Sequence, residues 1–164
     1  MLWLKTLALI VVSPGTIDVL LPWLILRATH ARPPASIGFL QVAGAVLVLV
    51  GAGFILFVAQ AFVRHGRGTP IPLEPPKNLV THGLFCFTRN PMFLGMVTII
   101  LGEALVFRSP ALLAYAGVVF LGLNAVLLFS EEPDLRRRFG SAYGRYVRIT
   151  PRWVGKRSPD CAAP

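Results

Sequence analysis

Two short polar clusters, about forty residues apart, carry the side chains whose chemistry stands out in this sequence. The first is Arg89-Asn90-Pro91, where an asparagine cap followed by proline predicts the start of a helix. Free N–H groups at a helix N-terminus favour an anion, so a ligand carboxylate would suit this place. The alternative without a ligand is a simple cap beside a basic residue at the end of an apolar helix.

The second cluster is Glu131-Glu132-Pro133-Asp134, which follows a long apolar run. Because proline cannot continue a regular helix, we expect the helix to break near Phe129 and a short new helix to start around the proline. Glu132 and Asp134 each have an arginine four residues later and can form ion pairs with it. Glu131 has no such local partner. It is therefore a candidate for binding a ligand ammonium or sulfonium, or else it marks the solvated end of a helix.

The elements that must position these clusters are apolar helices. Hydrophobic residues make up 55% of the 164 residues and charged residues 14%, and the mean hydropathy is +0.68. This composition excludes a water-soluble enzyme, a disordered tail and a secreted disulfide scaffold. The apolar residues gather into four runs, each about long enough to cross a hydrocarbon layer of roughly 30 Å. We therefore predict an all-α polytopic membrane protein with about four transmembrane helices.

The predicted runs cover residues 2–26, 37–63, 90–107 and 109–129. Pro14-Gly15 predicts a kink in the first run. Gly44 and Gly51, one heptad apart, predict a groove on the second run where a neighbouring helix approaches closely. Only Arg108-Ser109 separate the last two runs, so these runs are expected to form a tight antiparallel hairpin. The hairpin would bring the two polar clusters together in a cytoplasmic cap.

The distribution of charge predicts the orientation in the membrane. The chain carries 16 Lys and Arg against 7 Asp and Glu, a net charge of +9. Only Arg27, Arg32 and Arg108 among the basic residues flank one face, so the N-terminus, the proline-rich loop 69–76 and the tail are expected to be cytoplasmic. The tail from Glu131 interleaves arginines with apolar residues, as in a helix that lies on an anionic leaflet. Its place beside a span favours lipid over nucleic acid as the partner.

Two carboxylates, Asp18 and Glu103, lie inside the apolar runs, where ionisable groups are costly. Glu103 is about 18 Å along the helix from Pro91, too far to reach the proposed site. We expect it to face Asn124 or to lie near Arg108, and we interpret both acids as structural. Two cysteines and three histidines offer no zinc-ligand spacing, so no metal is expected.

The motifs around the two clusters resemble those of a known enzyme family. They comprise the run 79–95, then Glu131-Glu132-x-x-Leu135, then Phe139-Gly140-x-x-Tyr143-x-x-Tyr146 and Pro151-Arg152-Trp153. At these spacings they look like the membrane methyltransferases that include isoprenylcysteine carboxyl methyltransferase and the phospholipid N-methyltransferases. The resemblance covers roughly residues 69–153, about half of the chain.

The resemblance implies a methyltransferase that uses S-adenosylmethionine. Its cofactor would lie in a cytoplasmic pocket roofed by the tail, while a lipid-like acceptor, a prenylcysteine carboxylate or a phospholipid amine, arrives from the bilayer. The resemblance places the catalytic roles on Arg89 and Glu131, and Glu131 would take the cofactor ammonium. The implied cofactor contacts are Leu79, Val80, Gly83, Phe85, Arg89, Asn90, Pro91, Phe93, Glu131 and Glu132.

The sequence departs from the family pattern at a few of these places. The family often has His where Asn90 stands and Tyr where Phe85 and Phe93 stand. The prenylcysteine enzymes carry a substrate-binding arginine at the place of Leu127. These differences bear on the acceptor more than on methyl transfer.

The predicted organisation has three parts. Residues 1–63 would form two N-terminal transmembrane helices, residues 64–153 the methyltransferase core, and residues 154–164 a flexible tail. The alternative function is a non-catalytic membrane module that binds anionic lipid or a protein partner through its basic tail. The identity of the acceptor and the oligomeric state are left open by the sequence.

Overall fold

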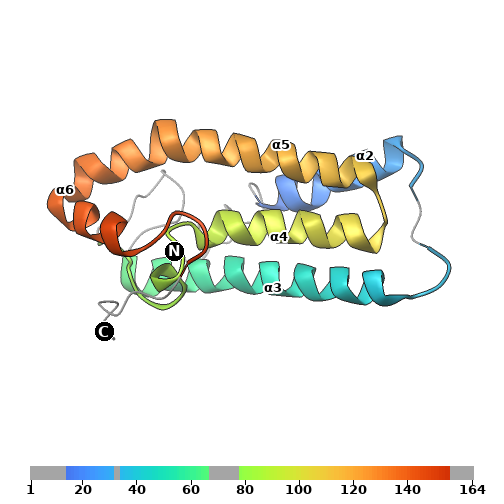
Figure 1. The fold of residues 1–164 in the computed structure, drawn as a ribbon, viewed down its shortest axis with the longest axis horizontal. Coiled ribbons are helices and arrows are strands. Elements are labelled where there is room, and N and C mark those ends of the chain that lie inside the picture. The colour runs from blue at the N-terminus through green and yellow to red at the C-terminus, as the bar shows by residue number, and fades with distance from the viewer. Residues whose placement is uncertain (1–13, 32–33, 67–77, 156–164) are drawn as a thin grey trace.

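The computed structural model describes residues 14–31, 34–66 and 78–155, and these residues form helices and no strand, which confirms the all-α prediction for this part of the chain. Figure 1 shows three long helices, α3, α4 and α5, lying along the longest axis. The elements are η1 (Thr16–Leu20), α2 (Leu21–Ala28), α3 (Phe39–Ala61), η2 (Phe62–Gly66), η3 (Gly83–Cys86), α4 (Pro91–Val106), α5 (Pro110–Val126), η4 (Leu127–Glu131) and α6 (Glu132–Ile149).

Two helical segments are long and apolar enough to cross a membrane. They are Phe39–Arg64 and Pro110–Ile149, of which the apolar part is α5; α4 is apolar but shorter. Large apolar side chains on these helices point away from the bundle, and their surroundings must therefore be apolar as well. Examples are Val42, Val46, Leu49 and Leu56 on α3, and Leu113, Val118, Leu121 and Val126 on α5.

The close approach of α3 and α4 rests on glycines at matching positions of the two helices. A Cβ atom at Gly51 would lie 2.5 Å from the carbonyl oxygen of Gly95, and one at Gly44 would lie 2.5 Å from that of Gly102. The predicted groove on α3 is thus confirmed, and α4 carries its own pair of glycines, also one heptad apart. Backbones packed this closely fix the register of α4, at whose N-terminus the first polar cluster lies.

We expect Gly51→Val to lower the free energy of unfolding by about 1–3 kcal/mol, because the side chain must force the two backbones apart. Gly53→Val is the matched control on the same helix, since a Cβ atom at Gly53 meets nothing within 4 Å. Thermal unfolding of both variants in detergent micelles measures the difference. Equal midpoints for the two variants would contradict the proposed packing.

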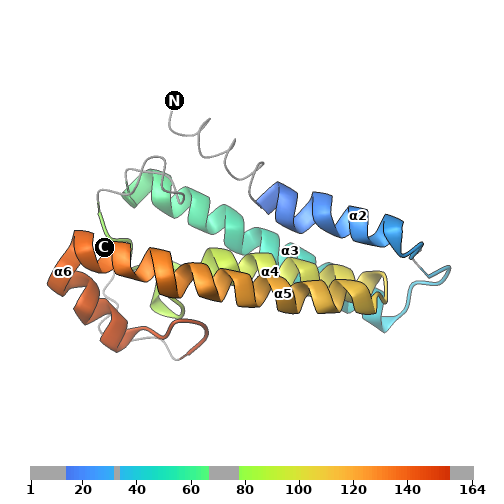
Figure 2. The same ribbon diagram turned by 90° about the horizontal axis from the view of Figure 1, so that it is seen from above.

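The hairpin of α4 and α5 forms as predicted, with residues 107–109 as the connection. Figure 2 shows the two helices side by side. The hydroxyl oxygen of Ser109 accepts a hydrogen bond of 3.3 Å from the N–H of Leu112, so this residue caps α5 as its Ser-Pro sequence predicts. The two ends of α4 and α5 remote from this turn therefore lie near each other.

The junction of α5 and α6 differs from the prediction. Instead of a break near Phe129, the helical backbone continues through the π-helical turn η4, and α6 begins at Glu132. The N–H of Glu132 donates to the carbonyl of Leu127, five residues back, so the wider turn accommodates the proline that follows. The chain bends later, at Gly140, whose φ of 48° and ψ of −121° suit glycine.

The two acids of the apolar runs lie close to each other. Glu103 interacts electrostatically with Asp18 and with Tyr115 of α5, a different neighbourhood from the expected Asn124 or Arg108. The hydroxyl of Tyr115 donates to the carbonyl of Ile17 at 2.9 Å and ties α5 to η1. The predicted kink at Pro14-Gly15 falls where the described residues begin, directly before the π-helical η1.

Candidate active site

The candidate site lies at the end of the bundle where α6 folds back toward the loop that precedes α4 (Figure 1). Residues 151–155, here called the C-terminal strap, run along this loop. The N–H of Arg89 donates to the carbonyl of Pro151 at 3.0 Å, and that of Gly155 donates to the carbonyl of Phe87 at 3.2 Å. The ring of Trp153 packs on Phe120 of α5 with centroids 4.9 Å apart. The strap thereby joins the loop to the bundle.

Asn90 has a different role from the predicted one. Its side chain makes no capping hydrogen bond at the start of α4, so this prediction is wrong. Its amide nitrogen donates to the carbonyl of Arg152 at 2.9 Å, and the hydroxyl of Thr88 donates to the same carbonyl at 3.2 Å. Pro91 occupies the first turn of α4 as expected. Asn90 is therefore a contact between the loop and the C-terminal strap.

Glu132 joins two arginines that are far apart in the sequence. Arg152 donates to both of its carboxylate oxygens, from Nε at 2.7 Å and from the terminal nitrogen at 3.1 Å, and Arg89 donates at 3.3 Å. The predicted ion pair with Arg136 is replaced by these bonds, whereas that of Asp134 with Arg138 forms at 2.8 Å.

Burial alone would raise the pKa of Glu132, but the hydrogen bond from Arg152 and the charge of Arg89 hold it below its usual value. Glu132 is therefore ionised at neutral pH and fixes both arginines. Arg89 also donates to the hydroxyl of Tyr143 at 3.3 Å. These contacts leave the guanidinium little freedom to move.

Glu131 has the opposite environment. Among the residues that the structure describes, none forms a hydrogen bond or an ion pair with its side chain. Burial, followed by the neighbouring charges of Glu132 and Asp134, raises the pKa of Glu131 from 4.5 to about 7. Two consecutive glutamates thus differ in charge state because one is paired and the other is not.

A small cavity of about 40 Å³ adjoins Glu131, and the start of α4 forms its other side. The Nε atom of Arg89 is buried and has no hydrogen-bond partner. The cavity therefore has an unsatisfied acid on one wall and an arginine with an unused donor on another, an arrangement that suits a zwitterion with a cationic centre. Its lining consists of Val58, Phe62, Phe85, Arg89, Asn90, Pro91, Met92, Phe93 and Glu131.

The cavity brings together six of the ten residues predicted to contact a cofactor, namely Phe85, Arg89, Asn90, Pro91, Phe93 and Glu131. Leu79 and Val80 instead pack in a hydrophobic cluster with Tyr143 and Tyr146. Gly83, with φ of 66°, contacts the ring of Phe57, and Glu132 holds the two arginines. These four residues support the cavity walls from behind.

Sequence reasoning missed part of the site. Val58 and Phe62 line the cavity from the end of α3, and the heptad glycines of that helix were the available signal. The sequence places Arg152 among the tail arginines expected on the membrane surface, whereas in the structure its guanidinium holds Glu132. The hydroxyl of Tyr146 donates to the carbonyl of Phe85 at 2.8 Å and fixes that part of the wall.

Fold and site together define an apolar helical bundle with a small cavity at one end, lined by Arg89, Glu131 and apolar side chains. The family model of the phospholipid methyltransferases matches residues 39–142 of this chain. The match includes α3, which precedes the motifs recognised in the sequence, and covers both polar clusters. No curated protein and no solved structure matches the chain. The chain belongs to the phospholipid methyltransferase family, a family of membrane methyltransferases.

The raised pKa of Glu131 predicts a pH-dependent stability. Its contribution is complete below about pH 4.5 and is lost as the pH rises through about 7, because the folded state opposes ionisation. We expect Glu131→Gln to be more stable than the wild type by about 1–3 kcal/mol at about pH 8, and equal at about pH 4. Thermal unfolding of both proteins in detergent micelles across this pH range measures the difference in stability. Arg137→Gln, which removes an exposed charge from α6, is the control and should keep the wild-type pH profile; a wild-type pH profile in Glu131→Gln would contradict the assignment.

Proposed function

We propose that this protein transfers a methyl group from S-adenosylmethionine to an amphiphilic lipid acceptor. The family supports methyl transfer. The observation that carries the choice of cofactor is the unpaired Glu131 carboxylate on the same cavity as Arg89. S-adenosylmethionine combines a sulfonium, an ammonium and a carboxylate, and these charges complement an acidic wall opposite a basic one.

Each charged residue then has a separate role. Glu131 binds the ammonium and gains the counter-charge that it lacks in the fold. Arg89, together with the N–H groups at the start of α4, binds the carboxylate. Glu132 is a positioning residue, because it holds Arg89 and Arg152 without lining the cavity.

Methyl transfer requires mainly positioning once the amine acceptor is neutral, because an ammonium group must first give up its proton, here to water, before its nitrogen can attack the methyl group. When bound, S-adenosylmethionine supplies an activated methyl group to an attacking nucleophile. The aromatic walls, Phe62, Phe85 and Phe93, exclude water and hold the acceptor in line. A cavity of about 40 Å³ has room for a methyl or ammonium group only. Binding of the whole cofactor therefore requires the segments around it to separate.

The acceptor that fits best is a phospholipid amine. Leu127, at the place of the substrate arginine of the prenylcysteine enzymes, is 1% exposed and belongs to the interior. It offers neither a charge nor a route to a carboxylate substrate. The name of the family also refers to phospholipids.

The proposed arrangement has four spans, with the candidate site at the cytoplasmic face. The outward apolar surfaces of α3 and α5 support insertion into the bilayer. The arginines of α6, next to the site, support a cytoplasmic position for that end under the positive-inside rule. A lipid amine in the inner leaflet would then be level with the cavity.

Equilibrium binding of radiolabelled S-adenosylmethionine to the purified full chain in detergent micelles tests the proposal. We expect Glu131→Gln to weaken binding about tenfold or more, because it removes a charge-assisted contact. Arg137→Gln, which removes an exposed charge from α6, should leave the affinity unchanged. Equal affinity of wild type and Glu131→Gln would remove Glu131 from the site.

The acceptor is tested by mass spectrometry of lipids from cells with and without the protein, in search of one additional methyl group on amine headgroups. The alternative function, a non-catalytic module that binds anionic lipid or a protein partner, is favoured by the exposed arginines at 136–138 on α6. It predicts no cofactor binding together with salt-sensitive association with anionic liposomes.

A further inference from the structure

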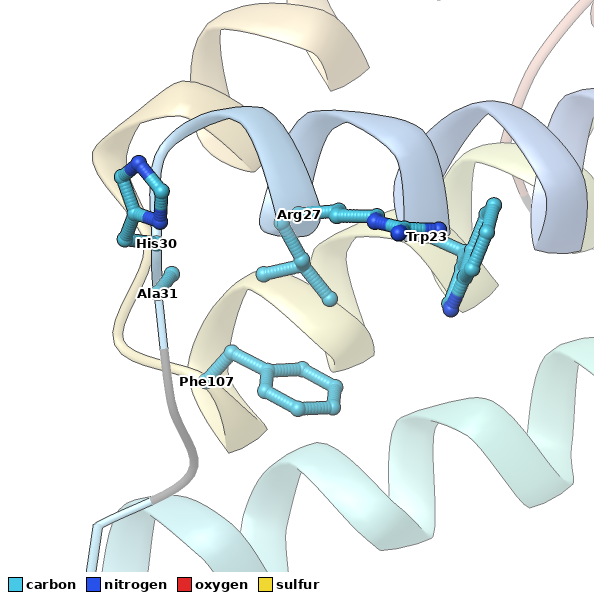
Figure 3. Close-up of a pocket in the computed structure, with 6 residues that line it drawn as sticks. Trp23, Arg27, His30, Ala31 and Phe107 are labelled. Carbon is cyan, nitrogen blue, oxygen red and sulfur yellow. The ribbon is translucent and has the colours of Figure 1, made fainter.

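A second and larger pocket lies at the opposite end of the bundle, between α2 and the end of α4. Its volume is about 310 Å³. Figure 3 shows Phe107 facing α2 from the end of α4, with Trp23 at one end of the pocket and His30 at the other. The lining comprises Trp23, Leu26, Arg27, His30, Ala31 and Phe107, so cationic and apolar side chains share one pocket.

Arg27 is the charged group best placed to hold a ligand here. Its guanidinium lies over the Trp23 ring, 5.2 Å from the ring centroid, and Figure 3 shows the side chain extending along α2 toward that ring. Within the described part of the chain no carboxylate forms an ion pair with Arg27. The stacking fixes the guanidinium while leaving its donors unused.

His30 occupies a backbone conformation that disfavours its side chain. It follows the C-terminus of α2 with φ of 52°, and the N–H of Ala31 donates to the carbonyl of Leu26 at 3.0 Å. This is the helix-ending motif in which glycine is usual. A non-glycine residue held at positive φ is strained, and such strain is concentrated at functional sites. Here it places an imidazole on the pocket.

The side chains around the pocket indicate which kind of anion it would bind. Leu20 and Leu24, on the same helical segment as Arg27, are exposed, so this segment also has an exposed apolar surface. Arg108, also at positive φ with 48°, adds another cationic side chain at this end of the bundle. A free phosphate would gain nothing from the apolar surface, whereas a phospholipid uses both the charges and the apolar side chains.

We propose that this pocket binds an anionic phospholipid of the leaflet opposite the candidate active site. The phosphate contacts Arg27 beside the Trp23 ring, the headgroup beyond the phosphate extends toward His30, and the acyl chains lie along the exposed leucines of η1 and α2. The site is separate from the methyl-transfer site and does not depend on the proposed function.

Native mass spectrometry of the full chain in detergent micelles, with added phosphatidylglycerol or phosphatidylcholine, tests the proposal. We expect one phosphatidylglycerol to remain bound in preference to phosphatidylcholine, and Arg27→Gln to reduce its retention about tenfold. Arg64→Gln is the matched control, because it removes an exposed arginine from η2, at the end of the bundle remote from this pocket. Equal retention of the two lipids, or equal retention by the two variants, would overturn the proposal.

A second variant separates lipid binding from folding. His30→Gly removes the imidazole and relieves the backbone strain, so its unfolding temperature without lipid should rise while its retention of phosphatidylglycerol falls. A purely structural role for His30 would not produce these opposite changes. Unchanged retention in this variant would overturn the assignment of His30 to the site.

Discussion

The ion pairs of Glu132 with Arg89 and Arg152 are the interaction on which this end of the molecule depends. They join the loop before α4, the start of α6 and the C-terminal strap, three segments far apart in the chain. A largely buried carboxylate that lost either arginine would be left with uncompensated charge. The three segments therefore hold each other in place, and the position of Arg89 on the cavity follows from this mutual constraint.

Glu131 and Glu132 are consecutive carboxylates with different surroundings in this fold. Glu132 meets two guanidinium groups, whereas Glu131 meets apolar walls and other acids, so their pKa values move in opposite directions. The π-helical turn η4 ends at Glu131, and α6 begins with Glu132. Two groups whose environments separate their pKa values are a usual sign of a ligand or catalytic site. In a membrane methyltransferase, the unpaired member is the natural partner of a cationic donor.

The helical bundle gives its two ends different chemistry. Glycine contacts between α3 and α4 set the register that carries Val58 and Phe62 to the cavity of the candidate active site. At the other end, α2 terminates beside Phe107 and leaves a pocket lined by Arg27, His30 and apolar side chains. Both ends meet the bilayer surface in the proposed orientation.

The sequence by itself determined the apolar helices, the α4–α5 hairpin, the close glycine packing and the convergence of the two polar clusters, because these follow from local periodicity and short connections. The sequence predicted a break at the proline, a capping role for Asn90 and a local ion pair for Glu132. The tertiary structure shows that all three predictions are wrong. A π-helical turn accommodates the proline, and the strap, distant in sequence, offers Asn90 a carbonyl and Glu132 a bidentate guanidinium. Such partners depend on how the chain folds back at Gly140, and local spacing carries no information about them.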